Sequence, residues 1–316
     1  MNAGAAGPWR EAPEAVLLRG PAGPRLRLLH GPIDLVIQAS GEEAEVAAAY
    51  RQARDAFAPV LGRLAAELPR LRRAAGPAAG GPAPEGPALE GLALEGPVAR
   101  AMQAATAPLA EDRFVTPMAA VAGAVADHVL AALLAGRRLR RAFANNGGDI
   151  ALWLGPGEAY RVALCADPVT GRMAGAMALA AGPEGLRRGI ATSGWRGRSH
   201  SLGIADAVTV LAGTAAAADA AATLIANAID LPGHPAIARV PASALAPDSD
   251  LGERLVTTAV GALSAAEVRA ALGAGAAEAA RLTAGGHILG AALLLAGDCR
   301  TVGSCGLEER AETAHA

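Results

Sequence analysis

AFANNGGDIALWL, residues Ala142–Leu154, places two apolar runs on either side of Asn-Asn-Gly-Gly. Alternating apolar residues around asparagine and glycine predict two antiparallel strands that meet in a tight turn. Two glycines also let a ligand approach the backbone closely, as a pyrophosphate or a nucleotide requires. The segment therefore predicts either a plain hairpin or a nucleotide-lining loop, and the sequence leaves both interpretations open. In the second case the lining residues are Asn146, Gly147, Gly148 and Asp149.

Upstream of this hairpin the chain opens with strands and continues into helix. Short apolar runs separated by Gly-Pro pairs predict strands at 15–18, 26–30 and 35–39. Helical periodicity then extends over 42–73, where Pro59 and Pro69 are expected to break the helix.

Two further helices flank the hairpin at a distance. One is expected over 118–134, with Thr116 as its N-cap and Pro117 at its first position, and its apolar surface on all sides indicates burial. The other is expected over 215–229, and a Ser-x-x-Glu capping box predicts a last helix over 264–272. Additional strands are predicted at 160–164, 174–180 and 208–211.

Composition divides the chain into one domain and three segments of simpler sequence. Residues 15–73 and 98–300 are expected to form a single domain, interrupted at 74–97 by a flexible insertion of glycine, proline, alanine and glutamate. Residues 1–14 are expected to be frayed, and 301–316 to form a tail.

The composition also excludes several classes of function. All 28 basic residues are arginine, so chemistry that needs lysine, as in P-loop enzymes, kinases and Schiff-base enzymes, is excluded. The formal net charge of -2 argues against nucleic acid as a partner. With 52% hydrophobic residues and 316 in all, the chain is long enough to bury one large core or two small ones.

Cysteine usage and apolar runs point to the cytoplasm. The three cysteines, Cys165, Cys299 and Cys305, are an odd number and predict reduced thiols. The first residues lack a basic region followed by an apolar core, so no signal peptide is expected. Apolar runs such as 288–297 reach about ten residues, short of the roughly 20 that span a bilayer. We therefore expect a cytoplasmic protein that does not enter the membrane.

A polar stripe marks the helix expected at 215–229. Asp219, Thr223 and Asn227 are spaced four residues apart and so share one face of a helix made largely of alanine. A buried carboxylate must be paired, hydrogen-bonded or bound to a metal. Asp219 and Thr223 offer hard oxygen ligands suited to Mg²⁺ or Ca²⁺. The alternative is that Asp219 faces solvent near the helix start, where the helix dipole favours a negative charge.

A third candidate segment, residues 189–201, combines hydroxyl groups, glycines, arginines and a histidine. Arg196 and Arg198 are suited to binding phosphate, although both are also compatible with a solvated loop. Ser193, His200 and Asp206 would supply a hydrolase triad, but the Gly-x-Ser-x-Gly elbow of such enzymes is missing.

Five motifs, in order along the chain, carry a resemblance to a known family. They are TPMAAVAGA (116–124), NGGD (146–149), TSG (192–194), ADAVTV (205–210) and ADAAAT (218–223). Together they resemble the ApbE-like superfamily, the FAD:protein FMN transferases once labelled thiamine-biosynthesis proteins. The resemblance is stronger to an allied group of unknown activity, uncharacterised protein family 0280. It covers about residues 110–230.

The resemblance implies an α+β fold of mainly antiparallel sheets packed with helices, a flavin-nucleotide cleft and a divalent metal. By this analogy Asp219 and Thr223 hold Mg²⁺. The loops that line the site for FAD or FMN would contribute Asn146, Gly147, Gly148, Asp149, Thr192, Ser193, Gly194, Arg196 and Arg198.

Two departures from the transferases bear on activity. Typical transferases have Gly-Lys-Gly-Tyr-Ala where this chain has only small apolar residues at 122–126, and their His-x-Ile-Asp-Pro segment is absent here. One hypothesis is a Mg²⁺-dependent FMN or phosphoryl transferase with Asp206 or His200 as general base. The other is a non-catalytic binding or assembly factor in cofactor biosynthesis. Helices rich in small residues would also suit a homodimer.

Overall fold

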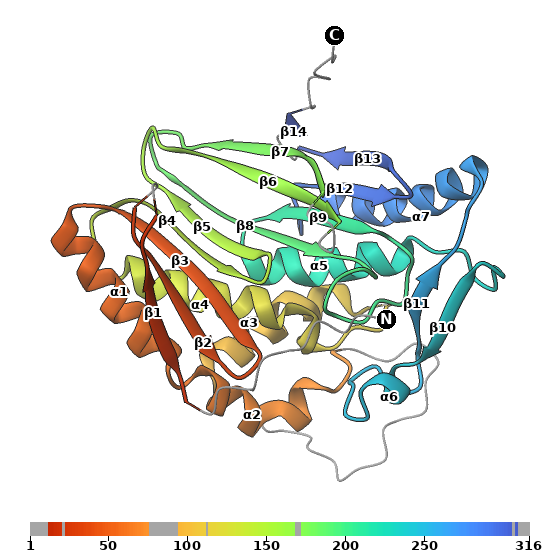
Figure 1. The fold of residues 1–316 in the computed structure, drawn as a ribbon, viewed down its shortest axis with the longest axis horizontal. Helices are drawn as coiled ribbons and strands as arrows, with labels where there is room; N and C mark the ends of the chain where they lie inside the picture. Colours follow the sequence, from red (N-terminus) through yellow and green to blue (C-terminus); the bar gives the residue numbers. More distant parts are fainter. Residues whose placement is uncertain are drawn as a thin grey trace.

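A nine-stranded antiparallel sheet forms the centre of the computed structural model (Figure 1). The structure describes residues 12–20, 23–75, 94–111, 113–167, 172–304 and 307–308. The strands lie in the order β1-β2-β3-β4-β5-β8-β9-β12-β13, which follows the chain, although long segments separate β3 from β4 and β9 from β12. Their bounds are β1 Glu14–Leu18, β2 Arg25–His30, β3 Ile33–Gly41, β4 Leu139–Asn146, β5 Asp149–Leu154, β8 Leu186–Ser193, β9 Ala207–Ala212, β12 Gly290–Leu295 and β13 Asp298–Gly303.

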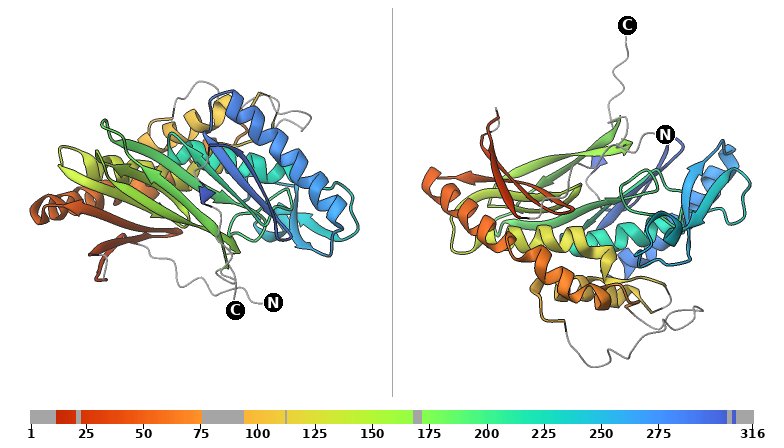
Figure 2. Two further views of the ribbon diagram at one scale, coloured as in Figure 1. Left: turned by 90° about the horizontal axis from the view of Figure 1, so that it is seen from above. Right: turned by 60° about the horizontal axis from the view of Figure 1, so that its bottom comes forward.

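Helices cover one face of this sheet, and a smaller sheet covers part of the other (Figure 2). The longer helices are α1 Glu43–Phe57, α2 Val60–Leu71, α3 Pro97–Thr106, α4 Val121–Leu134, α5 Ala215–Ala228 and α7 Ala265–Ala284. The smaller sheet consists of β6 Ala159–Asp167, β7 Arg172–Ala180 and β14 Leu307–Glu308. A separate ribbon contains β10 Ile237–Pro241 and β11 Leu255–Val260, joined through α6 Ala242–Leu245. The confirmed class is therefore a mixed fold with a large antiparallel sheet packed by helices.

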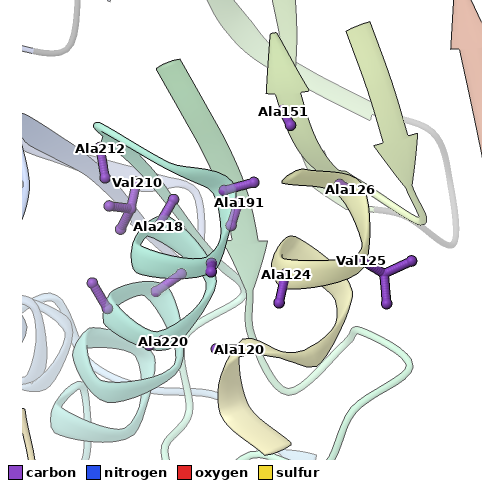
Figure 3. Close-up of a cluster of buried hydrophobic side chains, with 14 of the residues drawn as sticks. Ala120, Ala124, Val125, Ala126, Ala151, Ala191, Val210, Ala212, Ala218 and Ala220 are labelled. Atoms are coloured by element: carbon purple, nitrogen blue, oxygen red, sulfur yellow. The ribbon is translucent and has the colours of Figure 1, made fainter. Parts of the chain in front are cut away.

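Successive residues of the central strands supply the two cores. Because side chains alternate along a strand, Ala151 packs toward the helices while Leu152 packs toward the small sheet. Small side chains such as Ala191 and Ala212 line the helical face, where α4 and α5 lie side by side (Figure 3). Alanine is common at these contacts because it lets helix backbones approach the sheet closely.

Two glycines hold the start of α5 at this contact. An added Cβ at Gly123 of α4 would lie 2.2 Å from the carbonyl oxygen of Ala215. An added Cβ at Gly189 of β8 would lie 2.0 Å from the carbonyl carbon of Thr214. The first residues of α5 are thus wedged between α4 and β8, and neither position leaves room for a side chain.

Several sequence predictions are confirmed. Asn146 pairs with Asp149 across β4 and β5, so Gly147 and Gly148 form a two-residue hairpin turn. Both glycines have positive φ, 67° and 117°, a backbone conformation that residues with a side chain rarely adopt. The predicted strands at 15–18, 26–30, 35–39, 160–164, 174–180 and 208–211 and the helix at 215–229 are also present.

Three helix predictions need correction. Pro59 separates α1 from α2, but Pro69 lies inside α2, where only two helical residues follow it and little helical hydrogen bonding is lost. Thr116 does not cap a helix with its side chain, because its hydroxyl donates to Asp250; a 3₁₀ turn, Pro117–Ala120, precedes α4. The capping box at Ser264 and Glu267 is formed, yet the helix it begins extends to Ala284.

The structure describes only part of the predicted insertion and of the two predicted terminal segments. Residues 76–93 of the predicted insertion and 1–11 of the predicted frayed end lie outside the described residues. The last part of the insertion is held in place, because the N–H groups of Glu95 and Gly96 donate to the Glu67 carboxylate at 2.7 and 3.1 Å. In the predicted tail, β13 continues to Gly303.

One stretch of the described residues, Pro117–Leu134, is long and apolar enough to cross a bilayer by length and composition. The expectation that apolar runs stop at about ten residues does not hold there. Half of the stretch is buried inside the fold, and α4 packs against β4, β5 and α5. This is the position of a core helix, so the stretch is weak evidence for a membrane span.

Candidate functional site

Asp219 joins α5 to the start of α4. It lies in the second turn of α5, and its carboxylate accepts a hydrogen bond from the N–H of Gly123 at 3.0 Å. Asp127 makes the reciprocal contact, since it projects from α4 and accepts from the N–H of Ala216 at 2.9 Å. Each helix therefore provides a carboxylate that caps the other, where unpaired N–H groups and the helix dipole favour negative charge. The alternative that Asp219 only faces solvent is wrong.

Asp149 places a second carboxylate beside Asp219. It is the first residue of β5 and accepts from the N–H of Thr192 at 3.2 Å. Burial, and then the negative charge of Asp149, raise the pKa of Asp219 well above its usual range. Burial likewise raises the pKa of Asp149 to about 7, against the opposing effects of the Thr192 N–H and the Arg198 charge. Near neutral pH this acidic pair, Asp149 and Asp219, therefore favours a shared proton or a bound cation.

The structure brings the predicted glycine-rich and Thr-Ser-Gly segments to this pair. Asn146 ends β4 and donates from its side chain to the carbonyl of Ala122, one residue before the glycine that binds Asp219. Thr192 and Ser193 end β8, and the Thr192 hydroxyl lies 2.9 Å from that of Thr209. Gly194 follows, where an added Cβ would lie 2.5 Å from the Asp206 carbonyl oxygen. One end of the sheet and the starts of two helices thus meet at the acidic pair.

The loop between β8 and β9 is anchored on Asp206. This carboxylate accepts from Arg196 and from the N–H of Ala296, each at 2.7 Å. Arg196 also lies 4.8 Å from the centre of the Trp195 ring. His200 is exposed on the same loop. The catalytic roles predicted for Asp206 and His200 stay predictions, and the contacts of Asp206 are those of a loop anchor.

Thr223 continues the polar face of α5 one turn beyond Asp219 and is half-buried. Asn227, a further turn on, accepts from the N–H of Leu202 at 2.9 Å and so fixes the β8–β9 loop. Among the described residues no group of three or more histidine, cysteine, aspartate or glutamate side chains is placed to bind a metal. Two carboxylates and a hydroxyl are nevertheless hard oxygen donors, and Mg²⁺ commonly keeps several waters. The pair fits a divalent ion because its two carboxylates are half-buried and the charge of Asp149 disfavours ionisation of Asp219.

Sequence reasoning missed Gly123 and Asp127. A signal was present, because each helix has an aspartate four residues after a small residue in its first turn: Gly123 and Asp127 in α4, Ala215 and Asp219 in α5. This spacing places a carboxylate one turn into a helix, where it can reach the start of a neighbour. The spacing alone does not indicate that α4 and α5 are neighbours in the fold.

Residues 16–301 match the family model described as AbpE bacteria. The chain belongs to this family. A UPF0280 protein from Methanothermobacter thermautotrophicus is 40% identical over 118 residues, which are 37% of this chain and 44% of that protein. A UPF0280 protein from Methanopyrus kandleri is 37% identical over 131 residues, 41% of this chain and 48% of the relative. The chain thus matches less than half the length of these curated relatives.

Proposed function

We propose that this member of the AbpE bacteria family binds a pyrophosphate-containing nucleotide, of the flavin type, together with Mg²⁺. The observation that carries the proposal is the acidic pair. Its two carboxylates are half-buried and repel one another, and they lie beside a glycine turn and the ends of β4 and β8. A divalent cation would relieve this repulsion, and the pyrophosphate would then bind a site whose net charge is no longer negative.

Particular residues would hold each group. Asp219 and Thr223 would bind the metal, with Asp149 as the second carboxylate. Bound Mg²⁺ stabilises charge on phosphate oxygens and polarises the phosphoryl group. The turn at Gly147 and Gly148 has no side chain of its own, and the guanidinium of Arg198 lies over it. Thr192 and Ser193 offer hydroxyl donors at the end of β8.

Transfer of FMN or of a phosphoryl group is the reaction that such a site would support. A second candidate, a non-catalytic binding protein, is favoured by the residues at the start of α4. Positions 122–126 are Ala-Gly-Ala-Val-Ala, which provide neither a charged group nor an aromatic ring. Both functions require the binding site, so binding is tested first.

The binding test is calorimetric titration of Mg²⁺, FAD, FMN and ADP into the full chain and two variants. Asp219→Asn keeps an oxygen that accepts from Gly123 but removes the charge, and should abolish Mg²⁺-dependent nucleotide binding. Asp127→Asn makes the same change at the reciprocal cap and should retain it. Lack of nucleotide binding by the wild type, or equal binding by both variants, would overturn the proposal.

Turnover separates the two functions. The wild-type protein is incubated with FAD and Mg²⁺, and the release of AMP is followed by chromatography, with an acceptor protein fraction present and absent. Release that depends on Asp219 supports the transferase. Tight binding of FAD with no AMP under either condition supports the binding protein.

A further inference from the structure

Contacts on both sides of the β8–β9 loop fix the position of its exposed tip. At the neck of the loop, the N–H of Trp195 donates to the Ala205 carbonyl at 3.0 Å, and Arg196 binds Asp206. On the other side, an added Cβ at Gly203 would lie 2.1 Å from the Ala226 carbonyl oxygen, so the loop packs directly on the end of α5. The tip between these anchors contains Arg198.

Arg198 extends from this tip over the glycine turn. An added Cβ at Gly147 would lie 1.7 Å from Nη2 of Arg198, so the guanidinium occupies the space that a side chain at Gly147 would fill. The positive charge of Arg198 acts on Asp149, where it opposes the effect of burial on the pKa, and on Asp34. Asp34 already has its own partner, because Arg27 donates two hydrogen bonds to it at 2.8 and 2.6 Å. Asp149, which directly follows the glycine turn, is therefore the member of the acidic pair on which the Arg198 charge acts.

The two arginines of the loop differ in this respect. Arg196 is bound to Asp206 at 2.7 Å and stacked on Trp195, so its charge stabilises the loop itself. Arg198 is exposed, and its guanidinium lies over Gly147, where its charge acts on Asp149. An arginine in this position presents several N–H donors to any anion that enters beside the glycine turn.

We propose that Arg198 binds the pyrophosphate of the nucleotide, and that it exchanges Asp149 for phosphate when Mg²⁺ occupies the acidic pair. The inference rests on the proposed function and specifies how its two ligands are coupled. Without metal, Arg198 balances the charge of Asp149. With metal bound, Mg²⁺ balances Asp149, and the guanidinium is available to an anion.

This exchange makes the binding of Mg²⁺ and pyrophosphate mutually favourable, since each ligand increases the affinity for the other by the same factor. Removing the charge at Arg198 has opposite effects on the two ligands. The affinity for pyrophosphate falls, because its cationic partner is lost. The affinity for Mg²⁺ alone does not fall, because a competing positive charge beside Asp149 has been removed.

The test uses inorganic pyrophosphate and Mg²⁺ as probes in titrations of the full chain. Mg²⁺ is titrated alone, pyrophosphate alone in the presence of chelator, and the preformed magnesium complex last. Arg198→Gln should weaken binding of the complex by about tenfold or more, as expected for a charged hydrogen bond. Arg198→Lys should restore part of that loss. Arg54→Gln, which removes an exposed arginine on α1, should bind as the wild type does.

The outcomes separate the inference from the proposed function. Unchanged pyrophosphate affinity in Arg198→Gln would overturn the inference while leaving the metal site intact. A fall in affinity for Mg²⁺ alone would also overturn it, since Arg198 would then support the site structurally. A wild-type chain that binds neither probe would overturn the proposed function itself.

Discussion

Gly123→Ala tests the helix contact on which the site depends. The new Cβ would lie 2.2 Å from the Ala215 carbonyl oxygen and 2.7 Å from the Ala216 nitrogen, so α4 and α5 must separate by about 1 Å to reach ordinary contact. Overpacking of this kind costs roughly 1–3 kcal/mol. Separation would also weaken the hydrogen bonds of Asp219 and Asp127 to the opposite helices, each worth about 1 kcal/mol as a cap.

Alanine recovers up to about 1 kcal/mol of helix propensity, so the net loss of unfolding free energy is about 3 kcal/mol. For a chain of this size that corresponds to a fall in Tm of roughly 4–5 °C. The assay is urea unfolding followed by circular dichroism, with a thermal scan as a second probe.

The matched control is Gly62→Ala in α2, where an added Cβ meets nothing within 4 Å. This change should stabilise the helix by roughly 0.5–1 kcal/mol, because glycine is the poorer helix former. If Gly123→Ala proves as stable as the wild type, the close approach of α4 and α5 is incorrect. The acidic pair would then need a different support.

Three further predictions concern the carboxylates. In metal-free buffer, stability should fall as pH rises from about 4 to 7, because the native state, with the pKa of Asp149 raised to about 7, binds more protons there than the unfolded state. The unfolding free energy should change by at most about 4 kcal/mol over this range. A pH series of urea melts should show that the free energy depends less steeply on pH in Asp149→Asn than in the wild type. Equal dependence in the two proteins would contradict the raised pKa of Asp149. Asp127→Ala should lower the unfolding free energy by about 1 kcal/mol through loss of the cap on α5, with a smaller loss in Asp127→Asn, as chemical denaturation would show. Finally, Mg²⁺ at a hundred times its Kd should stabilise the wild type by about 2.7 kcal/mol, as thermal scans would show. Chelator should reverse this stabilisation, and it should be smaller at pH 5, where protons compete with the metal. Asp219→Asn should show no stabilisation by Mg²⁺.

The elements of the fold were predictable where local patterns are strong. Asn-Asn-Gly-Gly fixes the hairpin because few other sequences tolerate two positive φ angles in succession. The Ser264 capping box marked the start of α7 for the same local reason, since its hydrogen bonds involve neighbours in sequence.

Elements without such signals were missed or misplaced. β8 was interpreted as part of a binding loop, because Thr192 and Ser193 at its end suggested ligand contacts rather than a strand. Thr116 was expected to cap a helix, but Asp250, far along the chain, takes its hydroxyl group. Distant partners of this kind leave no trace in the local sequence.

The sequence by itself excluded several kinds of chemistry and placed the polar residues of one helix on a common face. The lack of lysine excludes several mechanisms, and the spacing of Asp219, Thr223 and Asn227 places them on one face of α5. Only the tertiary structure decided that Asp219 caps α4 and lies beside Asp149 of β5. Periodicity specifies the face that a helix presents, whereas the partner of that face depends on the packing of segments almost one hundred residues apart. The raised pKa values of the acidic pair result from that packing, because burial and mutual repulsion exist only once the chain has folded.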